Sequence, residues 1–492
     1  MRWSSATGST LRIAVGATCW AVCLGVAVAL AVRRSSGLWR WVLTAALPIP
    51  LLLPPAIVAI AWTHLLGKRG IAAQAWLALS GERELPFSIY NEAGAAWVLG
   101  LCWFPLVALT TLVGLRAVGA SSLAAGSVHA GPWFRMWRID LPLLLPYVSA
   151  GAAFVAWLAL GDLDLPPVLL TFTTVNTLTL LIYGAIKTLE IGRALALCVP
   201  LLAFSIAVLV ARQLLVRGVA VPTLDSRWRQ ERPEAQAPGT PPGGRVLQIL
   251  VVAILGVAVL LPVLALAHQT AAWENVRAAL ETAGREILNS FQTAAVAALL
   301  LVALSAPYAR LLTRQRGWPR LGLALLALLP LTIPPTLHGL AWTETLCQTA
   351  AGRALLASPF VISLAAAARF FPFGVFLLAA VFDGLAPQLL DAAKLSGAGA
   401  PLRWARIVFP LTGAGFLAAF AIAFAFSIGE LSAATLLNPP GYSTLPVRIS
   451  SLLHFNKDEL LAALCLAQVF LALVPYLAAA LFLERTLEVR LG

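Results

Sequence analysis

Charged residues are scarce in this chain of 492 residues. Asp, Glu, Lys and Arg together make up 11% of the sequence, whereas hydrophobic residues make up 60%. A soluble globular chain carries about a quarter charged residues, so this composition excludes a soluble globular fold. Many apolar runs are close to 20 residues long and lack period-two alternation, which favours membrane-spanning helices over strands. The sequence therefore predicts an all-α polytopic membrane protein.

Local motifs for metal binding, disulfide scaffolds and nucleotide binding are also missing. None of the six cysteines forms a CxxC pair, and the five histidines show no HExxH spacing, so we expect no metal site built from a local motif. No GxxxxGK[ST] phosphate loop occurs, so we expect no ATP hydrolysis, no enzyme activity and no cofactor in this chain itself. The net charge of +13 is spread over short loops rather than a separate basic domain, which argues against a nucleic-acid partner.

Eleven apolar segments are long enough to cross a bilayer. They lie near residues 11–32, 42–65, 96–118, 143–165, 191–215, 246–268, 289–311, 321–345, 361–384, 411–436 and 460–483. A stretch rich in Pro, Gly and charge separates the first five from the last six and is typical of a linker. We therefore predict a first unit at 1–216, a linker at 217–245 and a second unit at 246–492. The segment 11–32 is longer than the core of a signal peptide and is interpreted as a retained helix.

Arginines predict the orientation of these segments. Basic residues cluster in five loop regions that fall on the same side when the crossings are counted, and the linker is one of them. Under the positive-inside rule that side is the cytoplasm. The N-terminus is then outside and the C-terminus is cytoplasmic, in a multi-pass protein of the bacterial inner membrane.

One sequence motif occurs twice in the chain. "LAAGSVHAGPWFRMWRIDLP" ends at Pro142, and "DAAKLSGAGAPLRWARIVFP" ends at Pro410, 268 positions later. The same separation relates Gly161-Asp162 to Gly429-Glu430, whereas "PPAIVAIAWT" and "PPTLHGLAWT" further upstream are 280 positions apart. The chain is therefore interpreted as a tandem duplication. Both basic blocks face one side, so the two repeats are parallel, and the segment 246–268 has no counterpart in the first.

The second block resembles the EAA loop of ABC-importer permeases, in which EAA is followed by a glycine and, further on, by Ile-x-Leu-Pro. Asp391, Ala392, Ala393, Gly397 and Pro410 stand at matching places, with Asp in place of Glu. The fused layout most resembles permeases of the ferric-iron type. This resemblance implies two repeats of the ABC-importer permease fold, a translocation pathway between them, two separate ABC ATPase subunits and an extracytoplasmic solute-binding protein.

In such permeases the loop is a coupling helix that docks on the ATPase. The residues that the resemblance places at this contact are Ala124, Ala125, His129 and Gly131 in the first copy, and Asp391, Ala392, Ala393, Gly397 and Gly399 in the second. Small side chains permit close approach, and Asp391 can cap the helix or pair with a basic residue. The first copy has Leu123 for the acid and His129 for the glycine, so we expect the two docking sites to be unequal.

Three of the charged residues inside apolar segments stand out. They are Asp162, Glu430 and Arg369, and a charge in this position usually faces protein or a water-filled path. Asp162 and Glu430 are repeat-related and are expected near the outer ends of their helices, where they could line a gate. The alternative is that all three join helices structurally. The Pro-Pro pairs at Pro54 and Pro334 are expected to bend their helices.

The resemblance implies ferric iron as the cargo, with thiamine, polyamine or another small solute as the alternatives. An ion-driven secondary transporter also uses repeats, but it has no need for an EAA loop. A structural membrane scaffold does not explain the paired blocks.

Overall fold

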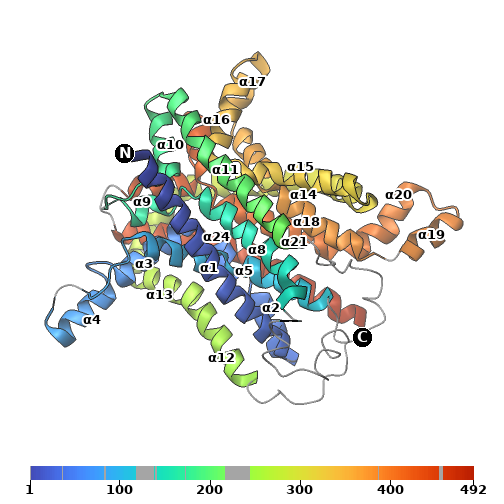
Figure 1. The fold of residues 1–492 in the computed structure, drawn as a ribbon, viewed down its shortest axis with the longest axis horizontal. Coiled ribbons are helices and arrows are strands. Elements are labelled where there is room, and N and C mark those ends of the chain that lie inside the picture. The colour runs from blue at the N-terminus through green and yellow to red at the C-terminus, as the bar shows by residue number, and fades with distance from the viewer. Residues whose placement is uncertain are drawn as a thin grey trace.

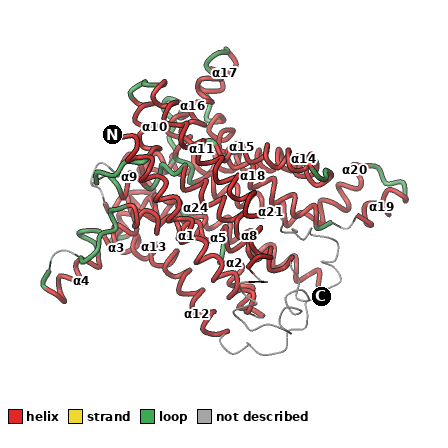
Figure 2. Tube along the Cα trace, in the orientation of Figure 1, coloured by secondary structure: helices red, strands yellow, loops and turns green. Residues whose placement is uncertain are grey.

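The computed structural model describes residues 2–35, 37–82, 85–117, 138, 141–171, 173–216, 244–385, 387–453 and 458–491. Across these ranges the elements are helices joined by short loops, with no strand (Figure 2). Nine helices are long and apolar enough to cross a membrane, or up to eleven if each of two bent pairs counts as one span. The predicted all-α polytopic membrane fold is confirmed.

Nine of the eleven segments expected from the sequence are continuous or nearly continuous helices. They are α1 (Arg2–Arg34), α5 (Glu92–Ala117), α8 (Leu141–Leu160), α11 (Ile191–Val216), α12 with η4 and α13 (Gly244–Leu255, Gly256–Leu260 and Leu261–Thr270), α14 (Trp273–Arg314), α18 (Phe360–Asp383), α21 (Phe409–Ile428) and α24 (Asp458–Leu491). Shorter helices connect them: α9 (Pro166–Leu169), α10 (Leu178–Lys187), α17 (Ala350–Leu356), α19 (Pro387–Leu395), α20 (Ala400–Arg403), η5 (Trp404–Val408), α22 (Ser432–Leu437) and α23 (Leu445–Leu452).

The two remaining segments are broken by the Pro-Pro pairs. α2 (Gly37–Ala46) and η1 (Ile49–Leu52) are followed by α3 (Pro55–Leu66) and α4 (Ile71–Ser80), with a bend of 91°. The second break separates α15 (Trp318–Thr332) from α16 (Pro335–Leu346), with a bend of 94°.

The two breaks have nearly the same backbone. Pro54 has φ −57° and ψ 138°, and Pro334 has φ −54° and ψ 138°. The residue before each pair, Leu53 or Ile333, is also extended, because proline disfavours the helical conformation of its predecessor and cannot donate a backbone bond. The predicted bending is therefore confirmed at both places.

Helices on either side of the linker follow one another in the same order. α1, α3, α5, α8, α9, α10 and α11 correspond to α14, α16, α18, α21, α22, α23 and α24. A repeated hydrogen bond supports the alignment: Leu178 N donates to Thr10 Oγ1 over 2.9 Å, and Leu445 N donates to Ser290 Oγ over 2.7 Å. Both bonds tie the start of a short helix to the first long helix of its own set. The boundaries at 216 and 246 stay a prediction, since residues 217–243 lie outside the described ranges.

Small residues let the long helices approach closely. A Cβ added at Gly25 in α1 would lie 2.8 Å from the backbone oxygen of Phe104 in α5, and the neighbouring interface positions Ala14, Ala17 and Ala21 are buried. Such small-residue stripes are typical of membrane helix packing, where close backbone contact replaces the hydrophobic driving force.

The segment formed by α12, η4 and α13 has no counterpart in the first set of helices, as the sequence indicates. α12 packs on α1, and α13 packs on both α3 and α24, so this segment touches helices of both sets. In Figure 1, α1 begins on the side of α9 and α10, whereas α24 ends on the side of α19 and α20. The bundle therefore has two distinct ends, one with α9 and the other with the projecting pair α19–α20.

Candidate functional site

Asp162 and Glu430 lie in matching turns at one end of the bundle. Sequence analysis places them within their helices, and this is wrong in detail, because α8 ends at Leu160 and α21 at Ile428. Each carboxylate accepts a backbone N–H three residues ahead: Asp162 Oδ2 from Leu165 over 3.0 Å and Glu430 Oε1 from Ala433 over 2.9 Å. Both side chains are buried. The repeated acids thus hold the turn into α9 and the turn into α22.

Glu430 has a counterion and Asp162 does not have the equivalent one. Arg369 on α18 donates to Glu430 Oε2, and only 13% of the arginine side chain and 4% of the glutamate side chain are exposed. The repeat-related position of Arg369 is Cys102 on α5, which lies within electrostatic range of Asp162. Arg369 also lies over the ring of Phe370, 5.1 Å from its centroid. The ion pair is therefore a feature of one half only.

Asp164 is a site residue that sequence analysis missed. Ser432 Oγ donates to Asp164 Oδ1 over 3.4 Å. These two residues are 268 positions apart and so occupy the same place in the two repeats. A residue that touches its own counterpart must lie near the axis that relates the repeats. In the sequence, Asp164 and Ser432 each lie two residues after the repeated acid, and this matching position was the available signal. The signal is weak, because the two repeats carry different residues there.

Two further contacts cross between the halves at this end. A Cβ added at Gly161 would lie 2.9 Å from Pro335 Cδ, and one added at Gly429 would lie 2.7 Å from Pro54 Cγ. Each glycine therefore packs directly on the Pro-Pro break of the other half. The exchange of equivalent contacts indicates a pseudo-two-fold arrangement, closed in this conformation.

Aromatic rings fill the interface next to these turns. Phe154 of α8 lies against Phe373 of α18, with centroids 5.2 Å apart, and Phe426 of α21 lies against Trp103 of α5, with centroids 6.2 Å apart. Phe373 and Phe426 are themselves 4.9 Å apart. These rings therefore pack helices of the two halves against each other.

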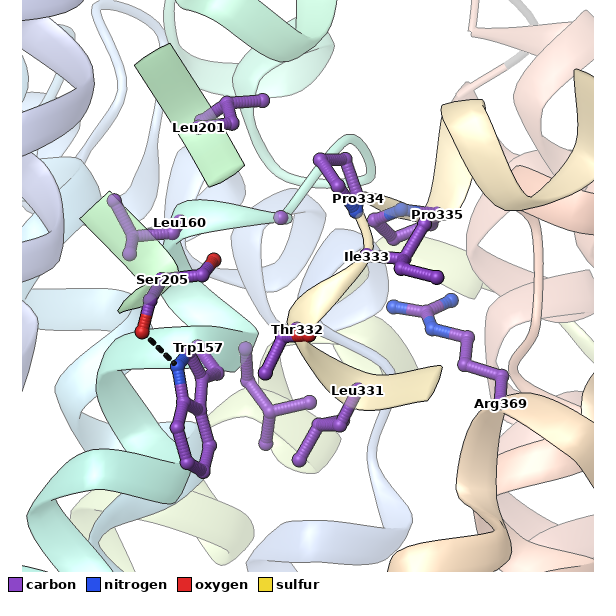
Figure 3. Close-up of a pocket in the computed structure, with 12 residues that line it drawn as sticks. Trp157, Leu160, Leu201, Ser205, Leu331, Thr332, Ile333, Pro334, Pro335 and Arg369 are labelled. Carbon is purple, nitrogen blue, oxygen red and sulfur yellow. Dashed lines mark hydrogen bonds between the residues drawn. The ribbon is translucent and has the colours of Figure 1, made fainter. Parts of the chain in front are cut away.

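A narrow pocket lies beside the second break. Its lining includes Trp157, Gly161, Ser205, Thr332, Pro334 and Arg369. Figure 3 shows Arg369 extending from α18 toward Ile333 and Pro335, opposite Trp157, whose Nε1 donates to the backbone oxygen of Ser205 over 3.1 Å. The pocket therefore combines helices of both halves with one guanidinium.

The acids do not form a metal centre. Among the described residues no group of three or more His, Cys, Asp or Glu side chains is placed to hold a metal ion. The histidines show no ligand spacing in the sequence, yet His64 Nε2 and His268 Nδ1 lie 3.3 Å apart and join α3 to α13. Two imidazoles without a third ligand do not make a metal site.

The second copy of the repeated block forms α19, a turn and α20, and projects from the bundle (Figure 1). Asp391 is the fifth residue of α19, so the expected cap at the start of that helix is wrong. Asp391 Oδ1 instead accepts from Lys394 Nζ over 2.8 Å within the same helix. Ala392 is exposed and Ala393 is buried. Only part of the small-residue stripe is therefore open to a partner.

Gly397 ends α19 rather than merely making room for a partner. Its φ is +78°. Ala398 N donates to Ala393 O, and Gly397 N donates to Lys394 O, both over 3.0 Å. This is the Schellman arrangement, which favours glycine in the left-handed position. The first copy, with Ala124, Ala125, His129 and Gly131, lies outside the described residues, so the inequality of the two loops stays a prediction.

Comparison with known proteins gives partial matches. No protein-family model matches the chain. It is 30% identical over 154 residues to the molybdenum transport system permease protein ModB of Mycobacterium bovis, covering 31% of this chain and 56% of the relative. It is 33% identical over 165 residues to the "Probable molybdenum ABC transporter permease protein" of Haloferax volcanii, covering 33% and 61%. It is 26% identical over 162 residues to ModB of Haemophilus influenzae, covering 32% and 68%.

The chain thus spans a little over half to about two thirds of the length of these relatives. The similarity supports the broader resemblance to ABC-importer permeases. It does not support the ferric-iron subtype, because the relatives are named for molybdenum transport.

Proposed function

We propose that this chain is the membrane-spanning permease of an ATP-driven importer in the bacterial inner membrane. The arrangement that carries this proposal is the meeting of two equivalent helix sets at Asp164–Ser432, at the end of the bundle opposite α19–α20. A pathway between two repeats that is closed at one end and contacted by a motor at the other fits alternating access. The partial similarity to importer permeases points the same way.

The projecting pair α19–α20 is the docking surface for an ABC ATPase. Its exposed apolar side chains include Leu389, Leu395 and Leu402, and Leu395 is 90% exposed. A surface of this kind on a short projecting helix suits insertion into a groove of a partner. The first block, from Leu123 to Pro142, supplies the second docking surface, so each chain takes two ATPase subunits, and these bring the ATP site.

The cargo is a small oxyanion, with molybdate as the first candidate. This assignment follows the names of the relatives and replaces ferric iron. Thiamine, a polyamine or another small solute, delivered by an extracytoplasmic binding protein, is the alternative. Asp162, Glu430 and Arg369 act at the gate, because they hold the turns at which the two halves meet.

Uptake into proteoliposomes tests the function. The full chain is reconstituted with its ATPase and binding protein, and radioactive molybdate and ferric iron are offered with and without internal ATP. We expect molybdate uptake that requires ATP. Uptake driven by an ion gradient without an ATPase would instead identify a secondary transporter, and ATP-dependent uptake of iron alone would overturn the choice of cargo.

A further inference from the structure

Three side chains that can donate hydrogen bonds at the second Pro-Pro break have no equivalent at the matching positions of the first. Arg369, Thr336 and His338 stand in the second half, where the repeat-related positions of the first half are Cys102, Ala56 and Val58. A polar group that the fold itself required would be expected in both halves. The difference therefore indicates a role that only the second half performs.

Two of these side chains are buried without a hydrogen-bond partner among the described residues. Thr336 is 0% exposed and His338 is 8% exposed, and neither Thr336 Oγ1 nor His338 Nδ1 has a partner. A buried unpaired polar atom costs about 1–3 kcal/mol. The cost is understandable if these groups serve a ligand that the resting protein does not hold.

The start of α16 adds to the positive potential. α16 has 12 residues, and its first residue, Pro335, lines the same pocket as Arg369, whereas Thr336 follows in the first turn and is not itself a lining residue. The first N–H groups of a helix have no intrahelical partner and attract anions together with the helix dipole. A guanidinium and the start of a helix thus line one pocket, and a buried, unpaired hydroxyl follows in the same helical turn.

We propose that this break is a transit site for a tetrahedral oxyanion, bound by Arg369, Thr336 and the first backbone amides of α16, with Glu430 as the competitor for Arg369. The inference deepens the proposed function, because it assumes that the cargo is an oxyanion. Arg369 suits this ligand, since guanidinium forms paired hydrogen bonds with planar edges of oxyanions.

The neighbouring acids set the limits of binding. Glu430 pairs with Arg369, whereas Asp162 and Asp164 face the same region from the turn after α8. Their charges disfavour a long-lived anion complex, and return of Glu430 to Arg369 displaces the ligand. A transport site must release its cargo, so competition of this kind fits transit rather than storage.

The site is closed in this conformation. Gly161 packs on Pro335, which leaves the pocket too narrow for a tetrahedral oxyanion. Separation of α8 from α16 opens it, and the same movement parts Asp164 from Ser432 because both contacts join the halves at the end of α8. Access to the transit site and opening of the outer gate are therefore one event.

Two variants of the full chain test the site without depending on transport. Glu430→Gln keeps an oxygen that can accept from Ala433 N but removes the competitor of Arg369. Arg369→Gln with Glu430→Gln removes the guanidinium as well. Thermal unfolding of each detergent-purified permease is followed with molybdate, sulfate, or chloride at equal ionic strength.

We expect molybdate and sulfate, but not chloride, to raise the midpoint of Glu430→Gln, with an apparent Kd at least about tenfold lower than in the wild type. The double variant should show no such shift. Thr336→Ala, which installs the first-half residue, should weaken the shift in the Glu430→Gln background. Equal shifts in the single and double variants, or no shift in Glu430→Gln, would overturn the transit site.

The outcome is separable from that of the proposed function. Molybdate uptake by wild-type proteoliposomes together with a failed binding test leaves the permease assignment in place and removes the site. Anion binding at Arg369 without ATP-driven uptake of any oxyanion would instead keep the binding site and overturn the proposed function.

Discussion

At the scale of single residues, the two halves differ in charge pairing at positions that their alignment matches closely. Glu430 has Arg369 beside it, whereas Asp162 has Cys102. Both acids accept an equivalent backbone bond, so the capping role is shared and the ion pair is not. A duplicated fold can retain its turns while one copy takes on an additional charge.

Arg369→Gln should destabilise the protein by about 3–5 kcal/mol, because it leaves a buried carboxylate without its counterion. Arg369→Gln with Glu430→Gln should recover most of that loss, since no buried charge is then left unpaired. Unfolding midpoints of the purified variants measure both. Asp162→Ala is the matched comparison and should cost only about 1 kcal/mol for its cap. An equal loss in the single and double variants would show that the pair adds no electrostatic stabilisation.

Gly397 makes a second prediction at this scale. Its φ of +78° is unfavourable for a residue with a Cβ, so Gly397→Ala should strain the turn by about 1–2 kcal/mol and shift the direction of α19. Gly397→Asn should be milder. Gly413 in α21, where nothing lies within 4 Å of an added Cβ, is the control, and Gly413→Ala should leave ATPase co-purification unchanged. Co-purification with the ATPase is the readout, and equal retention of the ATPase by all three variants would count against a positioning role.

At the scale of elements, the broken helices are tightly packed and the projecting helices α19 and α20 are exposed. Each break is held by a glycine of the opposite half, and the two bends differ by only a few degrees. α19 and α20 instead stand clear of the bundle, with exposed apolar side chains. Tight packing therefore marks the end at which the halves meet, and exposure marks the end that we propose for docking of the ATPase.

Gly429→Ala should disturb the first break, because its Cβ would lie 2.7 Å from Pro54. Overpacking of this size costs about 1–3 kcal/mol. Gly413→Ala in α21 is a matched control, since nothing lies within 4 Å of the added carbon, and a helical alanine is favoured over glycine. Unfolding midpoints should fall for Gly429→Ala and stay level or rise for Gly413→Ala. The opposite order would show that the glycine–proline contact is not tight.

Leu395→Glu tests α19 as a docking element. Leu395 is 90% exposed and Leu189, near the opposite end, is 83% exposed, so a charge at either place should leave the fold intact. We expect Leu395→Glu to lower ATPase co-purification by at least about tenfold and Leu189→Glu to leave it unchanged. Normal ATPase assembly with Leu395→Glu would remove this helix from the interface.

At the scale of the whole molecule, the contacts between equivalent residues define how the halves can move. Asp164 meets Ser432, and each glycine meets the other half's proline pair. The unpaired segment α12–α13 touches both halves, so its contacts would hold the halves together during the opening proposed at the α9 end. Opening at one end of a pseudo-two-fold pair is the rocking movement expected of transporters with repeats.

A disulfide across this contact should block the proposed transport. In a background without the native cysteines, Asp164→Cys with Ser432→Cys is oxidised in proteoliposomes, and ATP-dependent uptake is measured before and after reduction. We expect loss of uptake on oxidation and recovery with reductant, whereas each single cysteine should be insensitive to the oxidant. Full uptake by the cross-linked protein would mean that these residues do not separate during transport.

Topology is a further prediction at this scale. The arginine distribution places Ser4 outside and Arg229 in the cytoplasm. Cysteines introduced at the two positions should react with a membrane-impermeant reagent from opposite sides of the membrane. Labelling of both positions from the same side would show that the predicted location of Ser4 or of the linker is wrong.

The sequence alone determined the features that depend on composition and on spacing along the chain. Hydropathy gave the eleven apolar segments, the Pro-Pro pairs gave the two bends, and the fixed separations gave the matching order of helices. These are local properties, because a bilayer requires a certain length of apolar helix and proline interrupts the backbone wherever it stands.

Only the tertiary structure decided which polar groups meet. Arg369 and Glu430 are 61 positions apart, and Asp164 and Ser432 are 268 apart, so no local pattern joins them. The sequence singled out Glu430 and Arg369 as costly charges but could not pair them, and it passed over Asp164 and Thr336 because their partners or their burial come from other helices. Pairing depends on which helix faces which, and that is fixed by the close packing of small residues between helices rather than by any one segment.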